Sequence, residues 1–166
     1  MQRLDRMFDH LLFSLACVAA VILAAIALAI PVSVVMRNVS GGAIRGLFEV
    51  IEFGLLSATF LGAPWVLSRN GHVSVDLVVS NLPRRGRRIA DALANLIGMA
   101  VSAVFFWYAV QAMLASLSRG SMVRASFTYP EWWTLAIIPV AMALIVIEFL
   151  RRLLRPAGGD RALTGL

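Results

Sequence analysis

Long uncharged runs separated by short polar stretches dominate the pattern of this chain. The first run, residues 11–36, contains 26 residues without a charge, and a helix needs about 20 residues to cross a bilayer core. Three later stretches are also mainly apolar, with charges only toward their ends, so the pattern predicts an all-α integral membrane protein with four transmembrane helices. We expect these spans at about residues 11–36, 47–68, 89–117 and 132–150. Together they form a single membrane domain within residues 1–166, with a flexible tail at about 156–166.

Composition supports this interpretation. Hydrophobic residues make up 60% of the chain and charged residues 14%, whereas soluble domains have about 45–50% and about 25%. The first run is also longer than the roughly 7–15 apolar residues of a signal peptide, so we expect it to be retained as a helix.

The arginines predict how the spans are oriented. All 15 basic residues are arginine, and the net charge is +6. Two precede the first span, five lie in the central connection and four lie in the tail, against four in the other two connections. The positive-inside rule therefore places both termini and the central connection in the cytoplasm. Trp132 and Trp133 would then anchor the outer interface, and phospholipids explain the positive charge better than nucleic acid does.

The central connection, residues 69–88, predicts a short helix lying in the membrane surface. Its apolar stretch at about 74–82 is too short to cross a bilayer but can lie in the plane of the interface. Gly71 can end the preceding helix, and Ser74 could cap the short helix with Asp76 in its first turn. His72 and Asp76 are four residues apart, and a helix-entry cap at the membrane surface is favoured for them over a docking point for another subunit. Four arginines follow and are expected to anchor the segment to anionic headgroups: Arg84, Arg85, Arg87 and Arg88.

No pattern in the chain indicates an enzyme, a cofactor or a metal site. His10 and His72 are the only histidines, and neither lies in the middle of a span where haem ligands would be needed. No nucleophile, phosphate-binding or zinc-protease motif is present. Cys17 is the only cysteine and reads as a small apolar side chain.

Two features of the second span admit two interpretations. Glu49 and Glu52 share one helix face. A purely structural role, as a solvated or paired interfacial cluster, is favoured over a subunit contact or ion path. Gly62 closes a series of small residues at helical spacing, which indicates close helix packing within the subunit or against a partner.

Several segments together resemble the small permease (DctQ-type) subunit of the TRAP transporters, the tripartite ATP-independent periplasmic family. "SRNGHVSVDLV" is similar to that family's G-H-[IV]-x-V-D-x-[LIV] signature, "FGLLSATFLGA" to its second span and "FTYPEWWTLAIIPVAMALIVIE" to its last span. The resemblance covers about residues 37–148. Ala141 stands where glycine is expected, which is a mild departure.

The resemblance implies a subunit of the bacterial inner membrane that takes part in uptake of a carboxylate-bearing solute. A periplasmic binding protein would deliver the solute to a large membrane subunit that carries the sodium and solute sites and moves like an elevator, while this chain braces it. Substrate-binding residues are not expected here. The residues expected to carry the family motif or subunit contacts are Glu49, Glu52, Gly62, Gly71, His72 and Asp76.

Three alternatives remain open at the level of sequence. One is the small subunit of a tripartite tricarboxylate transporter, against which the His-x-x-x-Asp signature argues. Another is the membrane anchor of a respiratory enzyme, which predicts haem or quinone ligands within spans. The third is a self-sufficient small transporter or channel, which predicts flux through the isolated chain.

Overall fold

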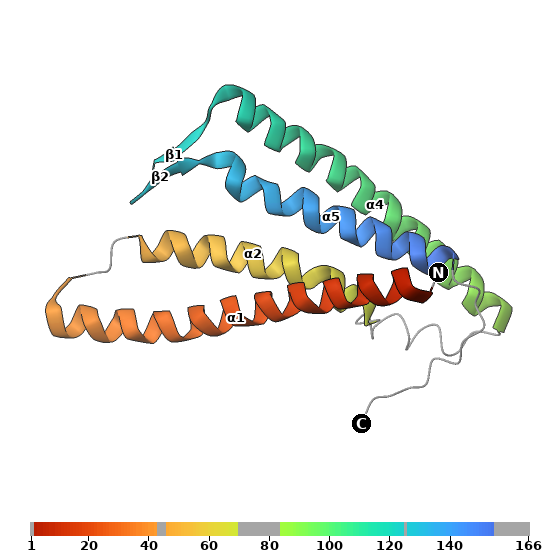
Figure 1. The fold of residues 1–166 in the computed structure, drawn as a ribbon, viewed down its shortest axis with the longest axis horizontal. Coiled ribbons are helices and arrows are strands. Elements are labelled where there is room, and N and C mark those ends of the chain that lie inside the picture. Colours follow the sequence, from red (N-terminus) through yellow and green to blue (C-terminus); the bar gives the residue numbers. More distant parts are fainter. Residues whose placement is uncertain (1, 43–45, 70–83, 125, 155–166) are drawn as a thin grey trace.

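Four long helices make up the fold in the computed structural model, which describes residues 2–42, 46–69, 84–124 and 126–154 (Figure 1). Each of the four is long and apolar enough to cross a membrane, as the sequence predicts. The helices are α1 (Gln2–Ser40), α2 (Leu47–Ser68), α4 (Arg84–Arg119) and α5 (Glu131–Leu154).

The helices are arranged as two antiparallel pairs. α1 packs along α2, α4 packs along α5, and the pairs join through α2 and α5. Figure 1 shows that the start of α1 and the end of α5 lie at one end of the bundle, while the turn between α4 and α5 lies at the other. This arrangement brings residues near the two ends of the chain together.

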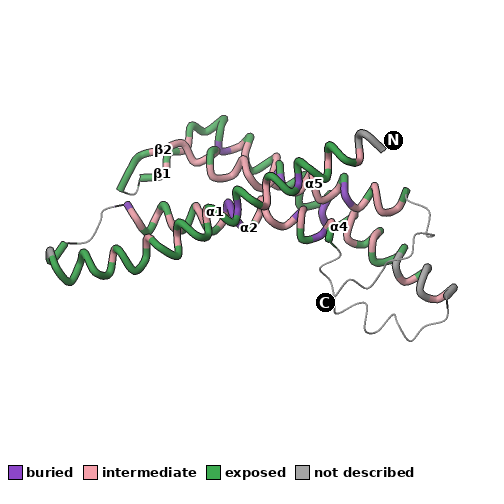
Figure 2. The backbone as a smooth tube through the Cα atoms, turned by 60° about the horizontal axis from the view of Figure 1, so that its bottom comes forward, coloured by how far each residue is buried: buried purple, intermediate pink, exposed green. Residues whose placement is uncertain are grey.

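Small side chains form most of the core. Among the few buried apolar residues, Leu12 and Ala141 are fully enclosed, and Ala19 and Ala58 are nearly so. Small residues let membrane helices approach closely, since apolar lipid offers no hydrophobic gain for packing large side chains. Figure 2 shows exposed residues along the helices in green. Many of these exposed residues are large and apolar, which suits a surface surrounded by hydrocarbon.

α2 has the bounds of its predicted span, whereas the other three helices extend beyond theirs. α1 has 39 residues and is therefore about 58 Å long, because the charged residues before residue 11 continue the same helix instead of preceding it. α4 begins at Arg84, so the arginine cluster lies in the first turns of a long helix. Hydropathy marks where a helix can sit in lipid and does not mark where its hydrogen bonding ends.

The connection between α4 and α5 is a short β-hairpin, which the sequence analysis did not predict. β1 (Met122–Arg124) pairs antiparallel with β2 (Thr128–Pro130). Gly120 has a φ of 62°, and the next amide, that of Ser121, donates to the carbonyl of Ser116 at 3.1 Å. This left-handed glycine ends α4 and turns the chain into β1.

Some predicted features lie outside the described residues. They are the in-plane helix at about 74–82, the motif residues Gly71, His72 and Asp76, and the tail at about 156–166.

Candidate functional site

Five charged side chains meet at the end of the bundle where α1 begins and α5 ends. Glu148 is 4% exposed and accepts hydrogen bonds from Arg151 at 3.0 Å and from Arg152 at 3.4 Å. Arg151 also contacts α1, with its Nη2 lying 2.9 Å from Asp5 Oδ1 and 3.0 Å from Asp9 Oδ1. We call Asp5, Asp9, Glu148, Arg151 and Arg152 the terminal cluster.

Charge balance explains why Glu148 can be buried. An unpaired carboxylate in a low-dielectric environment is costly, but Glu148 has two guanidinium groups one helical turn away on its own helix. Arg151 is the central residue because it neutralises Glu148 and reaches both aspartates of α1. The outer pair with Asp9, whose side chain is 58% exposed, contributes little by itself.

The terminal cluster joins three helices. Arg152 donates to the backbone carbonyl of Leu67 in the last turn of α2, where carbonyls lack partners within the helix and where a positive charge is favoured. The guanidinium of Arg151 lies 4.7 Å from the ring centroid of Phe8 on α1, a cation–π arrangement. Two neighbouring arginines on α5 therefore hold the ends of α1 and α2.

Polar contacts also join the elements at the opposite end of the bundle. The backbone N–H and hydroxyl of Ser126, in the hairpin, donate to Glu49 Oε1 at 3.3 and 2.8 Å. The hydroxyl of Ser116 on α4 donates to Glu131 Oε2 on α5 at 2.8 Å. We call Glu49, Ser116, Ser126 and Glu131 the hairpin contacts.

Gly46 adds a close packing contact at the same end. It precedes α2 with a φ of 82°, and a Cβ placed on it would lie 2.1 Å from the ring of Phe127. The hairpin thus rests on the start of α2, and glycine leaves the space for it.

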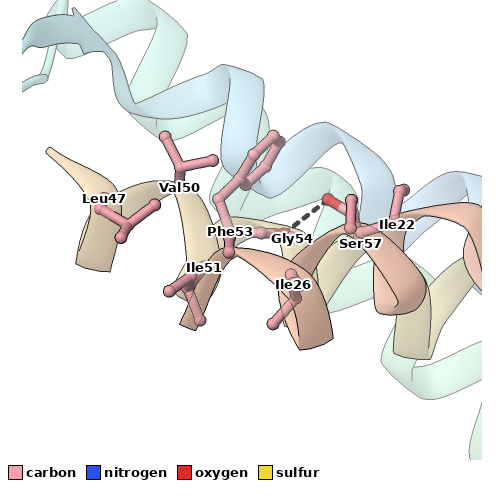
Figure 3. Close-up of a pocket in the computed structure, with 10 residues that line it drawn as sticks. Ile22, Ile26, Leu47, Val50, Ile51, Phe53, Gly54 and Ser57 are labelled. Atoms are coloured by element: carbon pink, nitrogen blue, oxygen red, sulfur yellow. Dashed lines mark hydrogen bonds between the residues drawn. The ribbon is translucent and has the colours of Figure 1, made fainter. Parts of the chain in front are cut away.

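An apolar groove lies between α1 and α2 (Figure 3). Its volume is about 350 Å³, and its walls include Ile22 and Ile26 of α1 and Val50 and Phe53 of α2. The hydroxyl of Ser57 is its polar group in Figure 3, and it donates to the backbone carbonyl of Phe53 at 2.7 Å. Such a lining suits a hydrocarbon chain and offers no charge to a carboxylate.

The predicted site residues are dispersed over the bundle. Glu52 is exposed on α2 and lies outside the hairpin contacts that hold Glu49. Gly62 lies on the α1 side of α2, where a Cβ would be 3.8 Å from that of Ala19. Trp132 and Trp133 lie in the first turn of α5 with their ring centroids 6.0 Å apart, and Trp133 is exposed.

The four arginines predicted to anchor the chain to headgroups occupy the start of α4, and their side chains lie outside the described residues. They are Arg84, Arg85, Arg87 and Arg88.

Sequence reasoning did not identify the terminal cluster. Two helical spacings of the cluster are visible in the sequence. Glu148 precedes Arg151 and Arg152 by three and four residues, and Asp5 precedes Asp9 by four. An even number of spans also brings both ends of a chain to one side. Joining the two groups required knowing that α1 and α5 end side by side.

The model of the family "Tripartite ATP-independent periplasmic transporters, DctQ component" matches residues 26–159, most of the chain. The resemblance predicted from the sequence is thereby confirmed. None of the curated proteins compared with the chain matches it. With four apolar helices able to cross a membrane and this match over most of its length, the chain belongs to the DctQ component family of the tripartite ATP-independent periplasmic transporters.

Proposed function

We propose that this chain is the stationary small subunit of a TRAP transporter of the bacterial inner membrane. It braces a large membrane subunit that binds sodium and solute and changes position during transport. The solute carries a carboxylate and arrives on a periplasmic binding protein. The match to a transporter-component family supports the class of protein, and the brace is our interpretation of its structure.

The observation that carries the proposal is the presence of polar ties at both ends of the bundle. The terminal cluster links α1, α2 and α5. Of the hairpin contacts, Ser126 with Glu49 links α2 to the α4–α5 turn, and Ser116 with Glu131 links α4 to α5. Helices tied at both ends resist shear, since sliding one helix would break charge-assisted bonds. A moving subunit gains its displacement only relative to such a fixed body.

The proposed orientation has both termini in the cytoplasm. The excess of arginine before the first span, in the central connection and after the last span supports it, as does the pairing of α1 and α5 through Arg151. We expect an impermeant thiol reagent added to intact cells to label Met122→Cys in the hairpin but not Gln2→Cys, both in a Cys17→Ser background. Labelling of Gln2→Cys but not of Met122→Cys would show that the orientation is the opposite of the proposed one.

Transport in reconstituted vesicles tests the proposed function. Vesicles that contain both membrane subunits, supplied with the binding protein and a sodium gradient, should accumulate the solute. Vesicles with this chain alone should show no flux, and vesicles with the large subunit alone should show reduced or no uptake. Flux through the isolated chain, or full uptake by the large subunit alone, would refute the brace.

A further inference from the structure

One face of α4 carries polar and amphipathic side chains where lipid would be expected. Trp107 is 62% and Tyr108 69% exposed, and Gln111, one turn further, is also exposed. These residues are three and four positions apart and therefore form one surface patch. We call Trp107, Tyr108 and Gln111 the α4 patch.

Trp107 and Gln111 of the α4 patch point away from α5, and Tyr108, which is 69% exposed, lies on the flank, about 90° around the helix from the side that packs on α5. The opposite side of α4 packs on α5, where Ser102 and Ser116 are buried and Gly98 abuts the ring of Phe149. At 100° per residue, Trp107 and Gln111 lie about 160° around the helix from that side. α4 is also the least covered span. In its most apolar stretch 6% of the residues are buried, against 17–22% in the other three helices, and Figure 2 shows much of α4 in green.

The α4 patch would lie deep in a membrane whose outer boundary is level with the start of α5. Ser116 marks the level at which α5 begins, because it hydrogen-bonds to Glu131. Gln111 lies five and Trp107 nine residues before Ser116, which is about 8 and 14 Å deeper along α4. Half of a bilayer core is about 15 Å, so Trp107 is close to the midplane. Helical side chains lean toward the N-terminus of their helix, which here is away from the nearer surface.

Donors and acceptors at this depth need partners. The indole N–H, the phenol and the carboxamide of the α4 patch form no hydrogen bond within the part of the chain that the structure describes. Hydrocarbon supplies none either, and an unsatisfied polar group there is unfavourable. Tryptophan and tyrosine facing lipid normally sit at the interface, where their polar ends reach water. Gln111 is a side chain of the kind that hydrogen-bonds between membrane helices.

We propose that the α4 patch is the membrane-embedded docking surface for the large subunit, which presents hydrogen-bonding groups at mid-depth. This inference rests on the proposed function and specifies the face through which the brace acts. The favoured partner is a protein helix, because a lipid tail cannot satisfy the carboxamide of Gln111. A second copy of this chain would be the competing occupant.

Site-specific photo-cross-linking in the two-subunit complex tests the face. A photoreactive phenylalanine analogue replaces Tyr108, and the same analogue at Val21, an exposed position on α1, serves as the control. We expect a cross-link to the large subunit from position 108 and none from position 21. A cross-link between two copies of this chain, or none from position 108 in an intact complex, would overturn the inference while leaving the proposed function standing.

Removal of the carboxamide gives a second test. Gln111→Leu suits lipid and points away from α5, so the chain itself should fold normally. We expect the amount of large subunit that co-purifies per copy of this chain to fall about three- to thirtyfold, which is the range that corresponds to one hydrogen bond between membrane helices. Thr59→Val is the matched control, since Thr59 is exposed on α2 and its hydroxyl already donates to the carbonyl of Leu55. An unchanged ratio for Gln111→Leu would contradict the inference, and failure of the wild-type chains to co-purify would contradict the proposed function itself.

Discussion

At the residue scale, Arg151 carries the largest share of the contacts between the two ends of the chain. Its side chain is 14% exposed, and its guanidinium contacts three carboxylates on two helices. The geometry uses the fork of arginine, in which separate N–H groups reach separate acceptors, and lysine could not reproduce it. Glu148, at 5% side-chain exposure, depends on this partner more than the aspartates do.

Arg151→Gln should destabilise the subunit strongly. It leaves Glu148 with Arg152 alone and removes the ion pairs to α1, and breaking a buried pair from one side costs about 3 kcal/mol or more. We expect the midpoint of thermal unfolding in mild detergent to fall by several degrees. Arg119→Gln is the control: Arg119 is exposed at the end of α4, so its replacement should change the unfolding midpoint little.

A double-mutant cycle separates the ion pair from general disruption. Glu148→Gln combined with Arg151→Gln should lose less stability than the two single changes added together, because neither partner is then left as an unpaired buried charge. Strict additivity would show that Arg151 and Glu148 are not coupled and that Arg151 acts through Asp5 and Asp9 or through packing against Phe8.

At the element scale, the close contact between α4 and α5 depends on a glycine. A Cβ on Gly98 would lie 2.4, 2.7 and 3.0 Å from three atoms of the Phe149 ring. The ring therefore lies on the bare backbone of α4, and close approach of this kind is the main source of packing energy between membrane helices.

Gly98→Ala should loosen this helix pair. Moving the half-buried ring of Phe149 costs about 1–2 kcal/mol, which exceeds what alanine gains as a helix former. Gly62→Ala is the matched control, because its Cβ would meet only ordinary contact at 3.8 Å; it should be neutral or slightly stabilising. The midpoints of thermal unfolding of both variants test this prediction. Adding Phe149→Leu should restore part of the stability that Gly98→Ala loses. Equal midpoints for the two glycine variants would contradict the proposed role of the contact.

The existence of the four helices could be predicted from sequence, whereas their ends and the hairpin could not. Charge-free runs such as 11–36 leave a membrane helix as the simplest interpretation. α1 begins nine residues earlier than that run, because charged residues such as Asp5 are compatible with a helix outside lipid. The hairpin strands have three residues each, too short for an alternating pattern to be recognised.

At the scale of the whole molecule, the family could be predicted and the internal ties could not. The signature around Gly71 and the layout of spans pointed to the DctQ component, and the family match confirms it. The terminal cluster joins Asp5 to Arg151, 146 residues apart, and only the packing of α1 beside α5 brings them together. Glu49 was visible as a polar residue near a helix start, but its partner, Ser126, lies in the unpredicted hairpin.

The arginines at the start of α4 provide the test of anchoring at this scale. Replacing Arg84, Arg85, Arg87 and Arg88 together with Gln should lower solute uptake by the assembled transporter. Each basic residue near an anionic surface contributes about 1 kcal/mol, so the brace would lose much of its resistance to tilt while solute capture by the separate binding protein stays normal. Arg119→Gln with Arg124→Gln, which removes charge at the hairpin end, is the control and should leave uptake near the wild-type level. Labelling of Met122→Cys must still occur from outside, which separates lost anchoring from an inverted chain. Normal uptake by the fourfold variant, with the complex intact, would mean that the brace is held by its partner and not by the membrane surface.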